Sequence, residues 1–276
     1  VFFYVTQVHV GDIDQTFYAH RFMDKEFGPA RNNFRSLAET GKESDRFIQV
    51  LGAMEFLGSK KLCHYHTSWK QSLQKAITLN IKHISAYSLT WEETTPLWKD
   101  LQTGKIQAVD EDTDRQMYET AIEILHAAGL KQYEISNFAK PDFQCRHNLR
   151  YWQNLPWIGL GPSAGSWYQN TRTTNTTNIK QYLEKIEKRQ FAFEESYTPT
   201  PEEAACETAV LNLRTLKGIN RRQFQSQTGF DPMIIFEKAI QQNQQAGLIE
   251  VTDSNIYLTK QALPIADTVE CDFSTI

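Results

Sequence analysis

The pattern of apolar and polar positions becomes regular from Thr67 onward and predicts a helix followed by a strand. Thr67 or Ser68 can cap this helix, which runs to about Asn80. Its apolar stripe at helical spacing consists of Trp69, Leu73, Ala76 and Ile77. The alternating segment 83–89 then predicts a strand, and Pro96 marks the loop that leaves it.

A second helix and strand follow in the same order. Acidic residues at 110–112 occupy a position where a helix N-terminus favours negative charge, and an apolar face continues until Gly129 ends the helix. Residues 133–136 predict a second short strand. A helix followed by a strand is the order found in an α/β layer or barrel, so this part of the chain is predicted to be α/β.

The next segment, 145–168, is rich in aromatic residues and glycine. It is too irregular to predict a helix and too apolar to lie fully in solvent. The run 169–178 is dominated by threonine and asparagine and predicts a surface connection. We therefore place a domain boundary at residue 176.

Beyond this boundary the pattern predicts three helices and a two-stranded hairpin. The helices span 201–217, 220–227 and 232–246, each closed by a glycine, and the strands span 248–251 and 256–259. This order is that of a winged helix, which commonly places a helix in a DNA groove. The third helix lacks the Lys/Arg cluster that phosphate neutralisation requires, so nucleic acid is not an expected partner.

Composition and charge favour an ordinary globular protein. The 276 residues are 40% apolar and 12% aromatic, which is enough to fill a core, and the formal net charge is -4. No stretch approaches the length of a membrane span, and the N-terminal residues lack the pattern of a signal peptide, so a cytoplasmic location is expected. The four cysteines, Cys63, Cys145, Cys206 and Cys271, are too far apart to seed a zinc or disulfide framework.

Four stretches, taken together, resemble the successive signatures of one protein family. They are residues 83–90, 133–139, 147–152 and 159–164, and residues 258–267 add a fifth. In this order they are similar to the family of HemW-type heme chaperones and oxygen-independent coproporphyrinogen oxidases. The resemblance covers about residues 67–276. The motif H-N-x-x-Y-W, intact at His147, Asn148, Tyr151 and Trp152, favours the HemW type over the oxidases.

The resemblance implies a heme site around this motif. A neutral imidazole is a natural axial ligand of heme iron, so His147 is the first candidate, and Tyr151 with Trp152 would provide an apolar wall for the porphyrin. Cys145 is a second candidate ligand. The alternative is that His147 and Asn148 only hydrogen-bond the backbone and that Cys145 is a small buried residue. The resemblance also places Thr90 and Gly165 near substrate and S-adenosylmethionine.

Several family features are missing from this sequence. The family's C-x-x-x-C-x-x-C loop, which holds a 4Fe-4S cluster and leaves one iron open to S-adenosylmethionine, has no counterpart here. We expect residues 1–66 to be a divergent or frame-shifted segment, and residues 67–175 to keep the last β/α unit of a partial TIM-like barrel plus the aromatic segment. The 83–89 strand would then have an uncovered edge and residues 67–140 marginal stability. Residues 176–276 would form the winged-helix-like domain.

Three functions follow from these features. The first is a HemW-like heme chaperone, truncated and without radical-SAM activity, that binds heme or porphyrin and serves a heme-recipient protein. The second is an oxygen-independent coproporphyrinogen III dehydrogenase of porphyrin biosynthesis, which would need the iron-sulfur cluster. The third is a protein-interaction module formed by the winged-helix part alone.

Overall fold

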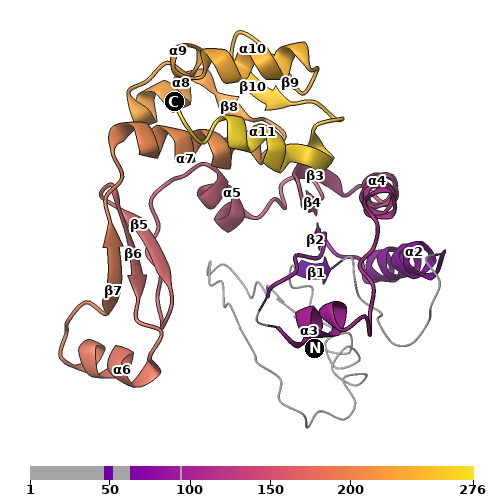
Figure 1. Cartoon of the computed structure of the whole chain (residues 1–276), viewed down its shortest axis with the longest axis horizontal. Helices are drawn as coiled ribbons and strands as arrows, with labels where there is room; N and C mark the ends of the chain where they lie inside the picture. The colour runs from indigo at the N-terminus through magenta and orange to yellow at the C-terminus, as the bar shows by residue number, and fades with distance from the viewer. Residues whose placement is uncertain (1–46, 52–62, 94) are drawn as a thin grey trace. The chain divides into compact units, whose positions relative to one another are not determined.

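The computed structural model describes residues 47–51, 63–93 and 95–276 as a mixed arrangement of helices and strands (Figure 1). The chain divides after Cys145 into two units, and each is described by itself. The boundary predicted at residue 176 lies inside the second unit, between a strand and a helix, and remains a prediction. Most of the predicted divergent segment 1–66 lies outside the described residues.

The first unit contains one sheet and three helices among its described residues. Its elements are β1 (Phe47–Leu51), α2 (Cys63–Thr78), β2 (His83–Tyr87), α3 (Pro96–Gln102), α4 (Glu111–Ala127), β3 (Lys131–Glu134) and β4 (Asn137–Ala139). The strand order is β1-β2-β4-β3, with β1 parallel to β2 and the other two pairs antiparallel. Because β2 is paired on both sides, the prediction of an uncovered edge at this strand is wrong.

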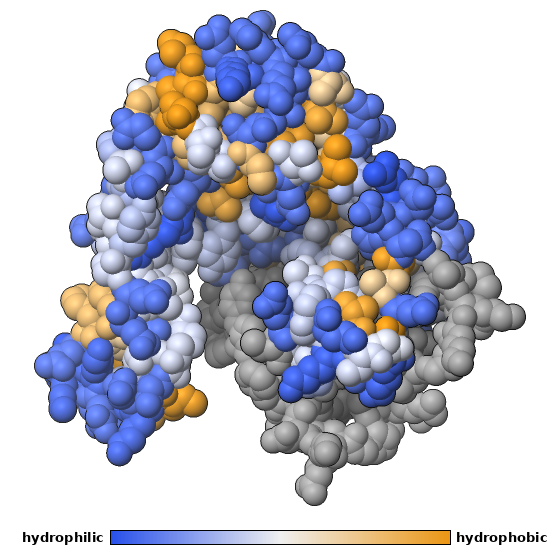
Figure 2. Space-filling view, viewed as in Figure 1, coloured by the Kyte–Doolittle hydropathy of each residue, from blue (hydrophilic) through white to orange (hydrophobic). Residues whose placement is uncertain are grey.

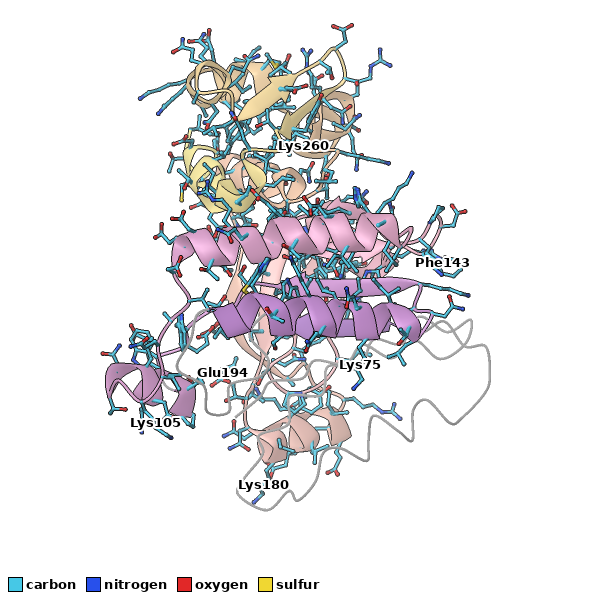
Figure 3. All side chains as sticks on the ribbon, turned by 90° about the vertical axis from the view of Figure 1, so that its right-hand side faces the viewer. Lys75, Lys105, Phe143, Lys180, Glu194 and Lys260 are labelled. Carbon is cyan, nitrogen blue, oxygen red and sulfur yellow. The ribbon has the colours of Figure 1, made fainter. Side chains whose placement is uncertain are left out.

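Helices α2 and α4 pack together and share a core with the sheet. Figure 3 shows the two helices side by side. The side chains of Leu73, Ile84, Leu125 and Phe138 are completely buried, and the indole N–H of Trp69 donates to the Met117 carbonyl at 2.8 Å. The predicted apolar stripes of both helices therefore face this core.

Local capping explains where these helices begin. Asp110 accepts a hydrogen bond from the Thr113 amide at 2.9 Å, so α4 begins where the acidic run predicted it. Pro96, however, is the first residue of α3 and not part of a loop, since Thr95 caps that helix. Helix α2 begins at Cys63, ahead of the predicted Thr67.

The second unit begins with a short helix and an antiparallel sheet. Its first elements are α5 (Arg146–Trp152), β5 (Gly165–Tyr168), β6 (Thr171–Asn175), α6 (Ile179–Glu187) and β7 (Phe193–Tyr197), with strand order β5-β6-β7. Two predictions are wrong here: part of the segment 145–168 is helical, and the polar run 169–178 contains β6. Gln169 and Asn170 both have positive φ, 49° and 57°, as a two-residue type I′ hairpin turn requires.

The remainder of the second unit is a helical module with a small sheet. Its elements are α7 (Pro201–Leu213), β8 (Ile219–Asn220), α8 (Arg221–Thr228), α9 (Pro232–Ile235), α10 (Glu237–Gln245), β9 (Ile249–Val251), β10 (Asn255–Leu258), η1 (Leu263–Ile265) and α11 (Ala266–Asp272). A capping box between Thr200 and Glu203 starts α7. Strands β9 and β10 form the predicted hairpin, and β8, which was not predicted, pairs with β10.

The predicted helix 232–246 is divided into α9 and α10 at Phe236. This residue leaves helical geometry, with φ -110° and ψ 23°, and its side chain is 2% exposed. Its ring contacts those of Phe224 and Phe273, at centroid distances of 6.0 and 5.2 Å. Burial of this aromatic cluster therefore accompanies the break in the helix. Figure 2 shows apolar residues on the surface at α9, where Ile234 is 74% exposed.

Candidate functional site

Helix α5 carries all four residues of the H-N-x-x-Y-W motif. Because residues four apart lie on one face of a helix, His147 and Tyr151 are neighbours, with ring centroids 4.6 Å apart in an edge-on contact. Tyr151 in turn makes an edge-on contact with Trp157, also at 4.6 Å. Burial raises the pKa of the Tyr151 phenol above its usual value.

The row of rings continues through a guanidinium group that the sequence did not point to. Arg172 on β6 lies over the ring of Trp157 at 5.4 Å and over that of Trp167 at 4.6 Å. One continuous series of ring–ring and guanidinium–ring contacts thus joins His147, Tyr151, Trp157, Arg172 and Trp167. We call these five residues the aromatic row. The sequence feature that could have indicated the role of Arg172 is its position as a single arginine inside a threonine-rich run.

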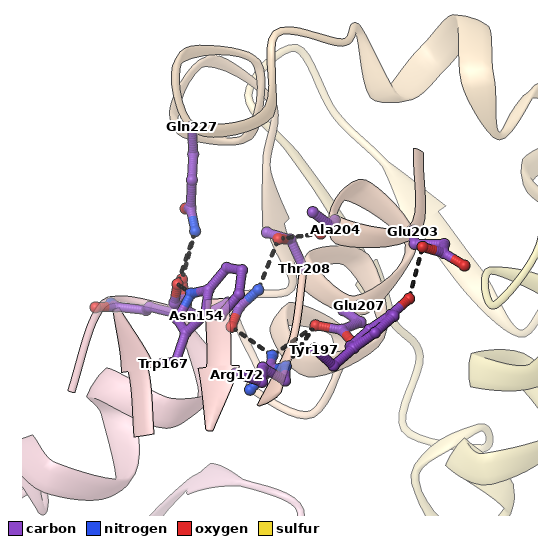
Figure 4. A network of polar contacts seen from close by, with 10 residues as sticks. Asn154, Trp167, Arg172, Tyr197, Glu203, Ala204, Glu207, Thr208 and Gln227 are labelled. Carbon is purple, nitrogen blue, oxygen red and sulfur yellow. Dashed lines mark hydrogen bonds and ion pairs between the residues drawn. The ribbon is translucent and has the colours of Figure 1, made fainter. Parts of the chain in front are cut away.

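Polar contacts hold the aromatic row against α7 (Figure 4). The Nε and Nη2 groups of Arg172 donate to one carboxylate oxygen of Glu207, at 2.9 and 2.6 Å. The third donor contact of Arg172 reaches the side-chain oxygen of Asn154 at 3.1 Å. Nearby, the Tyr197 hydroxyl donates to Glu203 at 2.6 Å, so β6 and β7 are both joined to α7.

Trp152, the last residue of the motif, has a different set of neighbours. The Arg214 guanidinium lies 4.9 Å from its ring centroid, and Arg214 also pairs with Glu270 at 3.4 Å and Asp267 at 3.7 Å. Burial raises the pKa of Glu270, opposed by the charge of Arg214. The His147 and Tyr151 rings therefore contact each other, whereas the Trp152 ring contacts Arg214 of the helical module.

Asn148 and Gly165 complete the sequence-predicted residues of the second unit. Asn148 lies half-buried on α5 beside His147. Gly165 is the first residue of β5, and its carbonyl accepts a hydrogen bond from the Trp157 indole at 3.1 Å. Gly165 therefore touches the aromatic row.

The remaining predicted residues, Cys145 and Thr90, belong to the first unit. Cys145 is buried, and its backbone N–H donates to the Tyr133 hydroxyl at 3.2 Å. Thr90 is exposed and follows β2. His147 and Gly165 belong to the second unit, and each unit is described by itself. A site shared by Cys145, Thr90, His147 and Gly165 therefore remains a prediction.

A buried polar cluster of the first unit was not predicted from the sequence. Its residues come from two of the family-like stretches: Ser85 donates to Asn137, Asn137 donates to Glu134, and the Glu134 side chain is completely buried. His83 contacts the Tyr133 hydroxyl at 2.9 Å, and burial lowers the pKa of His83 to about 3. These contacts tie β2 to the β3-β4 hairpin.

Two further properties of the described residues bear on the site. Among residues 47–51, 63–93 and 95–276, no group of three or more His, Cys, Asp or Glu side chains is arranged to hold a metal ion. None of the helices described there is long and apolar enough to cross a bilayer.

Comparison with known proteins identifies a class: part of the chain matches the HemN C-terminal domain, and its fold resembles that of a solved HemN structure. Residues 200–265 match the family model of the HemN C-terminal domain. The solved structure titled "Coproporphyrinogen III oxidase (HemN) from Escherichia coli is a Radical SAM enzyme" aligns with a TM-score of 0.65 over 88% of this chain and 57% of that one. Its sequence identity of 16% makes this a likeness of fold alone.

Sequence relatives narrow the class to one family. "Heme chaperone HemW" of Bacillus subtilis (strain 168) is 32% identical over 200 residues, covering 72% of this chain and 53% of the relative. The protein of the same name from Synechocystis sp. is 34% identical over 160 residues, covering 57% of this chain and 39% of the relative. In its C-terminal part the chain belongs to the HemW-type radical-SAM family. It spans about half the length of the Bacillus relative.

Proposed function

We propose that this chain is the heme-binding part of a HemW-type heme chaperone and that His147 is the axial ligand of the iron. The observation that carries the proposal is the placement of His147 and Tyr151 on one face of α5, in ring contact with each other. An imidazole supplies the nitrogen donor that heme iron accepts, and the aromatic row supplies flat apolar surface beside it.

The donor chemistry of α5 fits heme and does not fit an iron-sulfur cluster. Heme would supply an iron centre that accepts a nitrogen donor, and His147 would provide that donor. The chain's own residues would bind and orient the porphyrin: the His147 imidazole would donate a lone pair to the iron, and the neutral Tyr151 ring would lie beside the porphyrin. A 4Fe-4S cluster needs three closely spaced thiolates, and the four cysteines of this sequence are widely separated. We therefore propose no radical-SAM activity for this chain.

The finer assignments are also proposals. They are a barrel remnant at residues 67–175, a winged-helix-like module at 176–276, a heme-recipient protein as partner, and a cytoplasmic location. Support for the module comes from its helices followed by the β9-β10 hairpin. The name of the Bacillus relative supports heme as the ligand.

A hemin titration followed in the Soret region tests the ligand. We expect His147→Ala to weaken binding by about tenfold or more and to change the Soret band, because an axial ligand is lost. His126→Ala, which removes another histidine from an exposed site, serves as the control. Cys145→Ser decides between the two candidate ligands. An unchanged Soret band in His147→Ala refutes the proposed ligand, and a changed band in Cys145→Ser alone favours the thiolate.

A further inference from the structure

Both backbone and side chains hold the C-terminal end of α5. The amides of Gln153, Asn154 and Leu155 donate to the carbonyls of Leu149, Tyr151 and Arg150, at 2.9, 2.8 and 3.0 Å. The last carbonyls of a helix have no partner within it and need one elsewhere. Here Asn212 of α7 donates to the Trp152 carbonyl at 2.8 Å, and Gln227 of α8 donates to the carbonyls of Gln153 and Asn154 at 3.2 and 3.0 Å. The module that matches the HemN C-terminal domain thus adds side-chain contacts at the last residue of the motif helix and in the turn that follows it.

Asn154 is the point where these contacts meet (Figure 4). It is 2% exposed and has a left-handed backbone with φ 49°. Its side-chain amide donates to Thr208 of α7 at 3.0 Å, and the Trp167 indole N–H donates to its carbonyl at 3.2 Å. The side chain and the carbonyl of Asn154 are therefore bound by residues distant in sequence.

Helix α5 needs this support because it is short. It has seven residues, and none of them is fully buried. A helix of this length is marginal by itself in water, and little apolar burial is available to fix its orientation. The direction of the His147 imidazole consequently depends on what holds the opposite end of the helix.

We propose that Gln227 and Asn212 are positioning residues for the porphyrin site: they fix α5 so that His147 and Tyr151 present one geometry to the ligand. This inference rests on the proposed function. It assigns to the module that matches the HemN C-terminal domain the role of holding the motif helix. This role differs from binding nucleic acid or another protein.

Gln227→Ala tests the role, with Gln225→Ala on the same exposed helix as the matched control. Without heme, hydrogen exchange of residues 147–155 is expected to become about fivefold faster in Gln227→Ala, the effect of losing one net hydrogen bond. With heme, the affinity is expected to fall by a similar factor. The electron paramagnetic resonance of the ferric form is expected to broaden, because the imidazole loses its single orientation.

Conservative variants separate positioning from general stability. Gln227→Lys retains a long donor and is expected to restore exchange, affinity and spectrum. Gln227→Glu has an acceptor in place of the amide donor and is expected to behave like Gln227→Ala. Asn212→Asp removes the donor to Trp152 without changing the shape of the side chain and is expected to shift the same three readouts.

The outcomes distinguish this inference from the function on which it rests. Unchanged exchange in Gln227→Ala and Asn212→Asp overturns the inference, whether or not heme binds. Faster exchange with an unchanged ferric spectrum and affinity also overturns it, because these side-chain contacts would then be only structural. If the unaltered protein takes up no heme, the proposed function fails, and the exchange measurement alone still decides whether these contacts hold α5.

Discussion

Replacement of Asn154 by alanine tests the junction between the motif helix and the module. The side chain is buried and makes two hydrogen bonds, donating to Thr208 and accepting from Arg172. Neither partner is left without a contact by the change, since the Thr208 hydroxyl still donates to the Ala204 carbonyl and Arg172 still pairs with Glu207. The loss is therefore that of the bonds themselves, with little added desolvation penalty.

The expected destabilisation is about 3 to 4 kcal/mol. The neutral bond to Thr208 contributes roughly 1 kcal/mol, and the charge-assisted bond from Arg172 contributes about 2 kcal/mol. Alanine at the observed φ of 49° adds about 1 kcal/mol, because asparagine tolerates left-handed backbone better than alanine does. Asn154→Gly loses the same bonds without the steric penalty and is expected to be the milder variant by that amount.

Urea denaturation followed by tryptophan fluorescence measures both variants. Trp152, Trp157 and Trp167 belong to the second unit and report on its unfolding, while the first unit provides a common background. A loss below about 1 kcal/mol in Asn154→Ala would refute the reasoning about the hydrogen bonds. Equal losses in the alanine and glycine variants would refute the reasoning about the backbone.

Two further predictions concern single positions. Gly218→Ala should unfold the helical module, since a Cβ there would lie 2.0 Å from the Ile256 carbonyl oxygen at a φ of +63°; Gly229→Ala, with a φ of +85° and open space, should cost only about 1 kcal/mol, as thermal melts of both will show. His83 has a folded pKa of about 3 against 6.5 for the free side chain, so the first unit should lose stability as pH falls from 6.5 towards 3, by up to about 1.4 kcal/mol per pH unit. His83→Gln should flatten this slope in urea titrations at several pH values; an unchanged slope contradicts the assignment.

Elements with local signals were predicted well from the sequence. The acidic run 110–112 marks the start of α4, and the predicted start of a helix at residue 201 agrees with α7, because such signals lie within one turn. The hairpin between β5 and β6 was missed, since its turn uses Gln169, a residue with no preference for positive φ. Helix α5 was missed because it is short and part of the support at its C-terminal end comes from α7 and α8.

The candidate site was predicted only in its local part. The spacing of His147 and Tyr151 places them on one face once α5 is known to be helical. Tertiary packing brings Trp157 to Tyr151, Arg172 to Trp157, and Arg214 to Trp152, and single-sequence patterns contain no signal for such packing. The motif therefore identified candidate residues, but not the helix that carries them, the aromatic row or the contacts from α7 and α8.

The ion pair between Arg172 and Glu207 bears on how such proteins can be recombined. Together with the Tyr197 bond to Glu203, it makes the strands β5 to β7 and helix α7 partners in one cooperative body. A chimera that exchanges residues 176–276 with a relative would pair an Arg172 from one parent with a Glu207 position from the other. A crossover at residue 146 takes Arg172 and Glu207 from the same parent, so chimeras joined there should express as folded protein more often than those joined at 176.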